Sequence, residues 1–213
     1  MILLRPYLSL AAFAILALSL APGVSASIIE TEESVEANEL RGPVSYYGSN
    51  NVYSGNFQTS EDGNLRRGVL QFDLSGVEAD ILSANVSVRT NTSTTWTETI
   101  SFYLLDQDVD TSSVTWEQYS SGNAWDTPGG DFDPGLVVST TITKTSTLYG
   151  VWFDFDVRDL IQAAVDDERT VANLLMVADS ETISWRSDSA DTYPTLTTES
   201  QAIPEPASIA LLG

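Results

Sequence analysis

Hydrophobic and polar residues alternate along most of the chain, which is the period of half-buried β-strands. Between residues 67 and 74, for example, Leu70, Phe72 and Leu74 fall on one face of an extended chain. Similar alternation or β-branched runs predict further strands at residues 84–88, 100–104, 136–142, 174–178, 182–186 and 195–199. Clusters of Gly, Asn, Asp and Ser separate these short segments. We therefore expect residues 46–200 to form one all-β domain, an antiparallel β-sandwich of jelly-roll type.

One segment has helical rather than strand periodicity. Apolar residues recur at helical spacing from Val157 to Val165, and Asp166-Asp167 ends the apolar stripe. Asp156 precedes the stripe and is a residue type that caps helix N-termini, so we expect the helix to begin with Asp156 as its cap. The helix is short and amphipathic, and we expect it to cover one end of the sandwich.

The N-terminal segment has the features of a secretory signal peptide. Arg5 precedes an apolar run from Leu8 to Leu20, and Val24-Ser25-Ala26 supplies the small residues that a signal peptidase needs. The run is shorter than the roughly 20 residues that cross a bilayer. We expect residues 1–26 to be removed and the protein to be secreted. Residues 27–45 are acidic and weakly periodic, and we expect a leader that is either mobile or at the edge of the fold.

The composition restricts the possible chemistry. With 30 acidic and 9 basic residues, the chain has a net charge of −21. This field repels phosphate backbones and anionic lipids, so we expect no nucleic-acid partner and no membrane docking through basic patches. The chain has no Cys and no His, which excludes disulfides, Ser-His-Asp and Cys-His catalysis, and ordinary zinc sites.

The C-terminal residues 201–213 differ from the rest of the chain. Ile203-Pro204-Glu205-Pro206-Ala207-Ser208 places two prolines where a strand or helix cannot continue, and a short apolar run follows. This segment resembles the opening of the bacterial PEP-CTERM sorting signal. In that family a transmembrane stretch and a basic cluster follow the motif. Both are missing here, so we expect either a truncated chain or a degenerate signal.

The PEP-CTERM resemblance has implications for location and partners. It implies export from a Gram-negative type of bacterium and processing by an exosortase. It also implies residence at the cell surface or in the extracellular polysaccharide matrix. Contact with the membrane would then be transient, through the signal and sorting segments alone.

The body of the chain, from about residue 67 to residue 199, resembles the DNRLRE-type domain, a family grouped with carbohydrate-binding modules. Five stretches match in the family's order, namely RGVLQFDLSG, ILSANVSVR, SVTWEQYSSGNAWDTPGGDFD, VWFDFDVRDLIQAAVDD and ISWRSDSADTYPTLTTE. Residues 30–64 do not match the family's usual opening strand, which leaves the N-terminal boundary of the domain open. The resemblance implies a β-sandwich that binds carbohydrate.

Aromatic residues are the first candidates for glycan contacts, because sugar rings stack on flat aromatic faces. Trp125 lies in the Gly-, Asp- and Pro-rich segment GNAWDTPGG, so we select it as the exposed aromatic, with Tyr119 beside it. Trp116, Trp152 and Trp185 lie in strand-like stretches or at their ends. We expect these three to be core residues.

Arg67 and Arg186 are two of few basic residues, and both fall on stretches that match the family. Either guanidinium could hold a carboxylate or hydroxyl groups of a glycan through two hydrogen bonds. The alternative is an internal ion pair with one of the many acids.

Acidic residues provide candidate calcium ligands, because hard cations bind several carboxylate and carbonyl oxygens. The candidates are Asp106, Asp108, Asp110, Asp131 and Asp133. Thr111 occupies the place where an EF-hand needs Gly, so we reject an EF-hand and expect at most a generic Ca²⁺ site. The alternative is that these are solvated loop acids.

Three functions fit the sequence. We favour an exported, non-catalytic surface or matrix protein that binds extracellular polysaccharide through loops of its sandwich. The glycan would be neutral, or an anionic polymer gelled by calcium, because the acidic chain repels other anionic polymers. The first alternative is a structural spacer or assembly module without glycan affinity. The second is a glycosidase that uses a pair of carboxylates, although no motif singles out such a pair.

Overall fold

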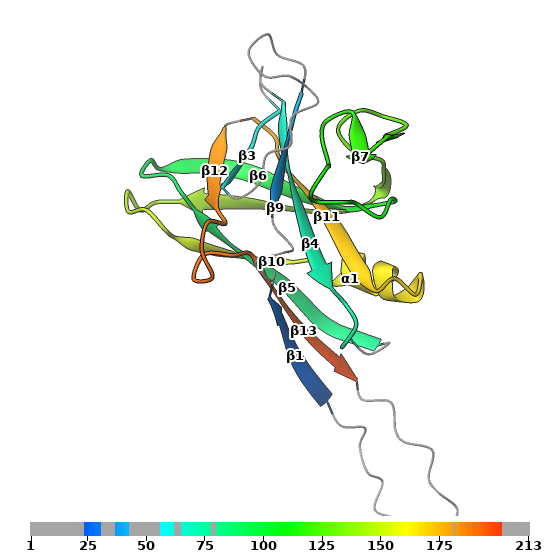
Figure 1. The fold of residues 1–213 in the computed structure, drawn as a ribbon. Helices are drawn as coiled ribbons and strands as arrows, with labels where there is room; N and C mark the ends of the chain where they lie inside the picture. The colour runs from blue at the N-terminus through cyan, green and yellow to red at the C-terminus, as the bar shows by residue number, and fades with distance from the viewer. Residues whose placement is uncertain are drawn as a thin grey trace, which may run out of the picture.

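Two antiparallel β-sheets packed face to face form the body of the protein (Figure 1). The structure is a computed structural model that describes residues 24–30, 37–42, 56–61, 65–77, 80–180 and 182–201. Within these ranges every strand pairing is antiparallel, and one helix accompanies the sheets. The predicted all-β antiparallel sandwich with one short helix is therefore confirmed.

The described strands belong to two large sheets and one small hairpin. The six-stranded sheet has the order β1 (Val24–Glu30), β13 (Thr195–Gln201), β5 (Asp80–Thr90), β12 (Ile183–Arg186) and β3 (Phe57–Thr59), and β10 (Trp152–Asp156) pairs with the other edge of β5. The five-stranded sheet has the order β2 (Asn38–Arg41), β4 (Arg66–Asp73), β11 (Val171–Ala178), β6 (Trp96–Leu105) and β9 (Phe132–Lys144). The hairpin joins β7 (Gln118–Ser120) and β8 (Asn123–Ala124). From β4 to β12 the chain crosses repeatedly between the two sheets, as in a jelly-roll type of sandwich.

The main hydrophobic core lies between the two sheets and is built from alternate residues of the long strands. Leu70 and Phe72 of β4 belong to the same fully buried cluster as Val86 of β5 and Phe102 of β6. The rings of Phe102 and Phe155 lie 5.1 Å apart across the sandwich. The alternation in the sequence therefore identified the core face of these strands correctly.

A second hydrophobic cluster covers the other face of the five-stranded sheet. Val69 of β4 and Leu175 of β11 are fully buried there, beneath a segment that we call the covering loop, residues 106–131. Trp116 and Trp125 of the covering loop belong to this cluster. Because β4 and β11 are covered on both sides, these strands carry apolar residues at consecutive positions rather than in strict alternation.

The predicted helix is present as α1 (Arg158–Asp166), and it packs Leu160, Ile161 and Ala164 into the main core. The cap prediction was wrong, because the N-cap residue is Val157, without a side-chain cap. Asp156 is the last residue of β10, and its Oδ1 accepts the N–H of Arg158 at 3.0 Å. Asp156 therefore stabilises the first turn from one position further out than expected.

The segment predicted as an acidic leader, residues 27–45, contributes to both sheets. β1 begins at Val24, before the predicted cleavage site, and pairs with β13, while β2 pairs with β4. Glu39 of β2 is only 1% exposed. Its carboxylate accepts hydrogen bonds from Arg41 Nε and, at 2.8 Å, from the N–H of Gln58. This acid is thus a structural link between β2 and β3, because a buried carboxylate has to be paired.

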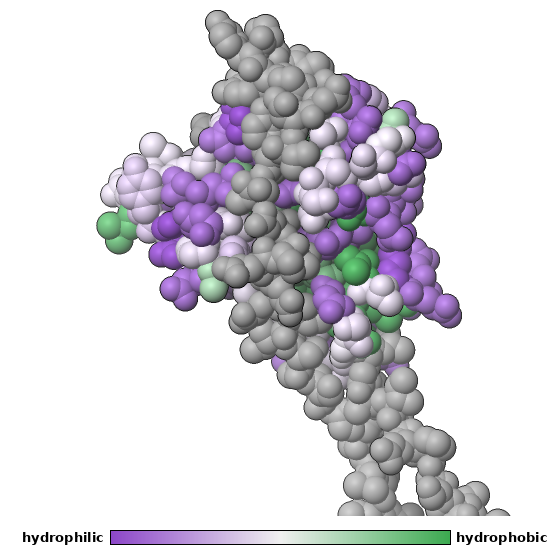
Figure 2. Space-filling model, viewed as in Figure 1, coloured by the Kyte–Doolittle hydropathy of each residue, from purple (hydrophilic) through white to green (hydrophobic). Residues whose placement is uncertain are grey.

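The surface of the described residues is largely polar, as Figure 2 shows for one face. The exposed large hydrophobic side chains among them are Leu82, Val137, Leu148, Tyr149 and Trp152. Among the described helical residues, no stretch is long and apolar enough to cross a membrane.

Candidate functional site

Trp125, the aromatic residue that the sequence selected for exposure, is only 4% exposed. Its indole Nε1 donates to the carbonyl oxygen of Thr115 at 2.9 Å, and its ring lies 5.5 Å from that of the partly buried Tyr119. The expectation of exposure was wrong because the covering loop folds back on the five-stranded sheet and needs its own apolar anchors. Trp125 offers no free face for a sugar, whereas Trp116 and Trp185 are buried as predicted.

Arg67 is held inside the protein by three contacts. Its Nε donates to Glu61 Oε1 at 2.7 Å, and its NH1 donates to the carbonyl oxygen of Gly129 at 3.1 Å. The guanidinium carbon also lies 5.2 Å from the centre of the Trp116 ring. These contacts are those of the internal pairing considered as the alternative, and they fasten the covering loop to β4.

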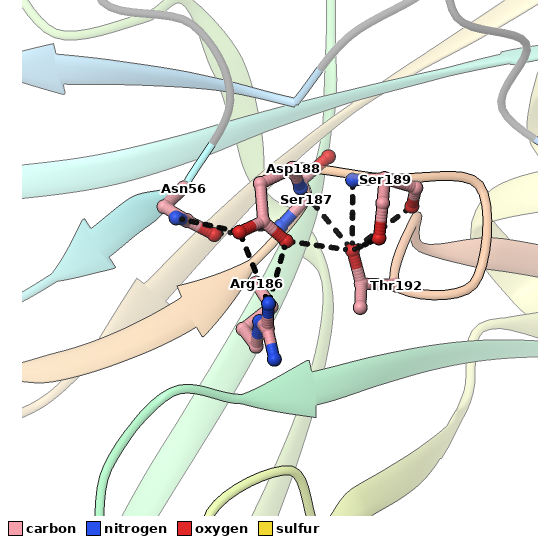
Figure 3. A network of polar contacts seen from close by, with 6 residues as sticks. All are labelled: Asn56, Arg186, Ser187, Asp188, Ser189 and Thr192. Carbon is pink, nitrogen blue, oxygen red and sulfur yellow. Dashed lines mark hydrogen bonds and ion pairs between the residues drawn. The ribbon is translucent and has the colours of Figure 1, made fainter.

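Arg186 belongs to a polar network at the end of β12 (Figure 3). Its NH2 lies 3.1 Å from both carboxylate oxygens of Asp188. Thr192 Oγ1 donates to Asp188 Oδ1 at 3.0 Å, and Asn56 Nδ2 donates to Oδ2 at 3.4 Å. The hydrogen bond from Arg186 is the main cause that holds the pKa of Asp188 below its usual value, against a smaller opposing effect of burial. The network fixes the loop that follows β12.

Most of the predicted calcium ligands accept hydrogen bonds from nearby residues of the turns in which they lie. Asp131 accepts the N–H groups of Thr127 and Asp126 at 2.7 and 2.8 Å, one on each carboxylate oxygen. Asp133 accepts the N–H of Gly135 at 2.7 Å. Both belong to local turns.

Asp110 similarly accepts hydrogen bonds from Ser112 and Ser113, which lower the pKa of its carboxyl group. Asp106 and Asp108 are exposed. In the described ranges no three His, Cys, Asp or Glu side chains are grouped closely enough to hold a metal ion. Calcium binding by these aspartates stays a prediction, and a ligand set would have to include carbonyl oxygens or a bound glycan.

Trp152, which the sequence assigned to the core, is 42% exposed. The reason is the alternation within β10: Phe155 is buried in the main core and Phe153 packs 5.5 Å from the ring of Trp96. Trp152 and Asp154 must then point outward. The period-2 pattern of WFDFD contained this information, but a position within a strand-like stretch does not by itself show which face of the strand a residue lies on.

Cross-strand pairing gathers polar side chains around Trp152 on the outer face of the six-stranded sheet. Trp152 pairs with Arg89 of β5, which pairs in turn with Arg186 of β12. Two residues further along β10, Asp154 pairs with Ser87, and Ser87 pairs in turn with Thr195 of β13. Directly paired residues share a face of the sheet, so these two rows lie side by side. Ser87 Oγ donates a hydrogen bond to Asp154 Oδ1.

These rows form the floor of a surface hollow that we call the Trp152 hollow. It is lined by Ser87, Trp152, Asp154, Ala190, Asp191, Tyr193 and Thr195. The wall comes from the loop after β12, which the Arg186–Asp188 network holds in place (Figure 3). The volume of about 280 Å³ lies just below the roughly 300–1,000 Å³ of typical small-molecule pockets. Such a hollow is suited to one or two sugar units of a longer chain.

Arg89 contacts both the Trp152 ring and the turn that precedes β10. Its guanidinium carbon lies 5.9 Å from the centre of the indole, and its Nε donates to the carbonyl oxygen of Gly150 at 3.2 Å. Gly150 has φ +75°, and a Cβ there would lie 2.5 Å from Arg89 NH2. The positive φ favours glycine at this position, and the absence of a Cβ leaves room for the Arg89 guanidinium between the Gly150 carbonyl and the indole.

The Trp152 hollow combines the groups that glycan recognition requires. The indole provides a flat apolar face, Ser87 and Thr195 provide hydroxyl groups, and Asp154 and Asp191 provide acceptors for sugar hydroxyls. The sequence did not single out these residues as a set, because they come from three strands and a loop far apart in the chain. Of the four ligand-binding residues that the sequence proposed, Trp125, Tyr119, Arg67 and Arg186, only Arg186 lies beside the hollow.

Comparison with known proteins leads to a family rather than to an individual relative. A search of curated proteins finds no match to this chain. The model of carbohydrate-binding module family 96 matches residues 44–200, which is most of the chain and includes every residue of the Trp152 hollow. The chain belongs to carbohydrate-binding module family 96.

Proposed function

We propose that this protein is an exported, non-catalytic module that binds extracellular polysaccharide, with the Trp152 hollow as its contact site. The observation that carries the proposal is the exposed, braced indole of Trp152 in a polar hollow, within a domain of a carbohydrate-binding family. Membership of that family suggests binding rather than catalysis. The finer resemblance to DNRLRE-type domains supports the same proposal.

Export and a place at the cell surface or in the matrix are supported by the two ends of the sequence. The predicted signal peptide precedes the domain, and the PEP-CTERM-like segment follows it. Residues 1–23 and 202–213 lie outside the described residues. N-terminal sequencing of protein recovered from the periplasm or medium of an expressing Gram-negative host tests the export step. A mature N-terminus at Ser27 is expected, and retention of Met1 on all recovered protein would contradict it.

Binding is tested by affinity electrophoresis in gels that contain neutral, amino-containing or uronic polysaccharides. The parent protein should be retarded by at least one polysaccharide, and Trp152→Ala should migrate as in an empty gel. Loss of a stacking aromatic face costs about 1–3 kcal/mol, which is about five- to 150-fold in affinity. Leu82→Ala is the matched control, since Leu82 is an exposed apolar residue outside the hollow.

The outcomes of this assay are decisive for the site. Equal retardation of Trp152→Ala and the parent would show that the site lies elsewhere. Failure of every polysaccharide to retard the parent would overturn the binding function itself. Uronic polymers are run with and without calcium, because the chain of net charge −21 repels them unless a divalent cation bridges the two surfaces.

A further inference from the structure

The edge of the five-stranded sheet at β9 lacks the features that usually protect a sheet edge. β9 is the last strand of this sheet, and among the described residues it pairs with β6 alone. An edge strand offers unpaired backbone N–H and C=O groups to other extended chains, and proteins usually protect it by shortness, charge or proline. Residues 136–143 of β9, with the sequence LVVSTTIT, contain no charged residue, no Pro and no Gly. This edge is therefore open to pairing.

Three other strands at sheet edges are short or charged. β3 has only three residues. β2 has four, and two of them are Glu39 and Arg41. β10 has five, and it carries Asp154 and Asp156. With thirteen residues and an uncharged central part, β9 differs from these strands in both length and charge.

The charge of the chain limits where two copies can meet. Copies with a net charge of −21 repel each other over most of their surface. The stretch from Pro134 to Phe153, which contains most of β9, has no Asp or Glu. A second copy that approaches along this edge therefore meets less repulsion than elsewhere.

The sequence of β9 is also complementary to itself, in an antiparallel register centred on Thr140. In this register Ser139 lies opposite Thr141 of the second copy on the outer face, and Val138 lies opposite Ile142 on the inner face. Hydroxyl groups thus meet hydroxyl groups, and aliphatic side chains meet aliphatic ones. The pairing of β6 with β9 already has this pattern on the outer face, with hydroxyl contacts of 2.8–3.0 Å in the pairs Thr97–Thr143, Thr99–Thr141 and Ser101–Ser139.

The inner side of β9 has room for the side chains of an added strand. Val138 and Thr140 are half-buried and line a hollow of about 320 Å³. Asp156, Arg158 and Asp159 line the same hollow at the start of α1, and Arg158 pairs with Asp159 at 2.7 Å. The inner residues of a second β9 would lie over this hollow and cover the half-buried side chains.

We propose that β9 is the interface of a two-fold symmetric homodimer, in which the two five-stranded sheets join into one continuous sheet. The two-fold axis of such a pair is perpendicular to the joined sheet, so both six-stranded sheets lie on the same side of it. The two Trp152 hollows then face the same way, and both could contact one polysaccharide chain or surface. The dimer itself does not depend on the proposed function.

Sedimentation velocity of the purified protein over a range of concentrations measures the association. We expect a species of twice the mass of the chain at high concentration. Its share should rise when salt is added, because salt screens the repulsion between two acidic copies. The mass of a single chain at every concentration and salt level would overturn the proposal.

A pair of charged variants tests whether β9 is the interface. Ser139→Glu with Thr141→Glu puts like charges opposite each other in the expected register and should weaken the dimer at least about tenfold. Thr97→Glu with Thr99→Glu is the matched control, since it adds the same charges to the same face of β6, one strand away from the edge. The control should keep the dimer. Equal loss of the dimer in both variants would show that the interface is not at β9.

A charge-reversed variant keeps the test decisive if the glutamate variant folds poorly. Ser139→Lys with Thr141→Lys should also weaken the dimer when it is studied alone. An equimolar mixture of the glutamate and lysine variants should form a heterodimer, because each glutamate then lies opposite a lysine. If the mixture fails to associate, the proposed pairing of β9 with β9 is wrong.

Discussion

The covering loop and the outer face of the six-stranded sheet each carry tryptophan, but they use it in opposite ways. Trp125 and Trp116 are 4% and 5% exposed, whereas Trp152 is 42% exposed. The covering loop is rich in Asp, Ser and Gly, which favours the expectation of a solvated binding loop. It nevertheless acts as a lid over the five-stranded sheet. The strand that looks like core carries the exposed ring, so local composition is a poorer guide here than the face on which a residue lies.

The largest effect on stability is expected from replacing the buried Trp125 of the covering loop. Trp125→Ala should lower the free energy of unfolding by about 3–5 kcal/mol, because it removes a large buried ring and leaves a cavity between the loop and the sheet. Urea denaturation followed by circular dichroism measures the change. A loss below about 1 kcal/mol would mean that the covering loop is not packed on the sheet as described.

The turn at Gly129 tests the packing of the covering loop at a single backbone position. Gly129 has φ +95°, and an added Cβ would lie 2.8 Å from the Trp116 ring, so Gly129→Ala should cost about 2–3 kcal/mol through strain and overpacking. Gly122→Ala is the control, since Gly122 has φ +81° but no atom within 4 Å of the added Cβ. It should cost about 1–2 kcal/mol in the same denaturation assay. Equal losses in the two variants would show that the Trp116 ring does not press on this turn.

Replacing the exposed Trp152 should have the opposite result to replacing Trp125, namely a small loss of stability and a large loss of polysaccharide binding. Trp152→Ala should lower the free energy of unfolding by only about 1–2 kcal/mol, because the 42% exposed ring loses less buried surface than Trp125, together with its contact with Arg89. The same variant should lose the polysaccharide binding that Trp125→Ala retains while it is folded. Thermal denaturation and affinity electrophoresis on the two variants together check this. A Trp152→Ala variant that unfolds as easily as Trp125→Ala would place the ring in the core after all.

The smallest effect on stability is expected from Asp188, in the loop that forms the wall of the Trp152 hollow. The pKa of Asp188 is lowered in the folded protein, so its stabilising effect is complete above the usual value of about 3.9. It is lost as the pH falls through the lowered value. Asp188→Asn should therefore be less stable than the parent at pH 7, by under about 1 kcal/mol for a partly exposed pair. The difference should shrink in urea denaturation below pH 4, and a difference that grows on acidification would reverse the assigned direction of the pKa shift.

The sequence predicted the fold better than the site, and particular residues show why. Alternation placed Leu70, Phe72 and Phe102 in the core, because burial on one side of a strand repeats every second residue. The same rule, applied to residues 152–156, would have turned Trp152 outward. The Trp152 hollow could not be assembled from the sequence, since Ser87, Asp154 and Thr195 meet only through the pairing of β5 with β10 and β13. Register between strands distant in the chain depends on the whole fold.

Two other differences come from burial that the residue type does not reveal. Glu39 lies in the segment that was expected to be a leader, either mobile or at the edge of the fold, but it is buried where Arg41 and the backbone of Gln58 can pair it. Trp125 was expected in solvent, but the second hydrophobic cluster needs an anchor at its position. In both cases the partner that decides burial is a feature of the assembled sandwich, so composition alone was an unreliable guide.

The five tryptophans allow the central claim, that Trp152 is the sugar-stacking residue, to be tested in one titration. The measurement is a ¹⁵N-¹H correlation spectrum of the indole N–H groups, with Trp152 assigned by Trp152→Phe. The titrant is an oligosaccharide of the polysaccharide that retards the protein most. The Trp152 signal should shift progressively with added sugar, while the buried Trp116, Trp125 and Trp185 signals stay within the line width. Shifts at Trp125 or Trp116 with an unmoved Trp152 would contradict the account.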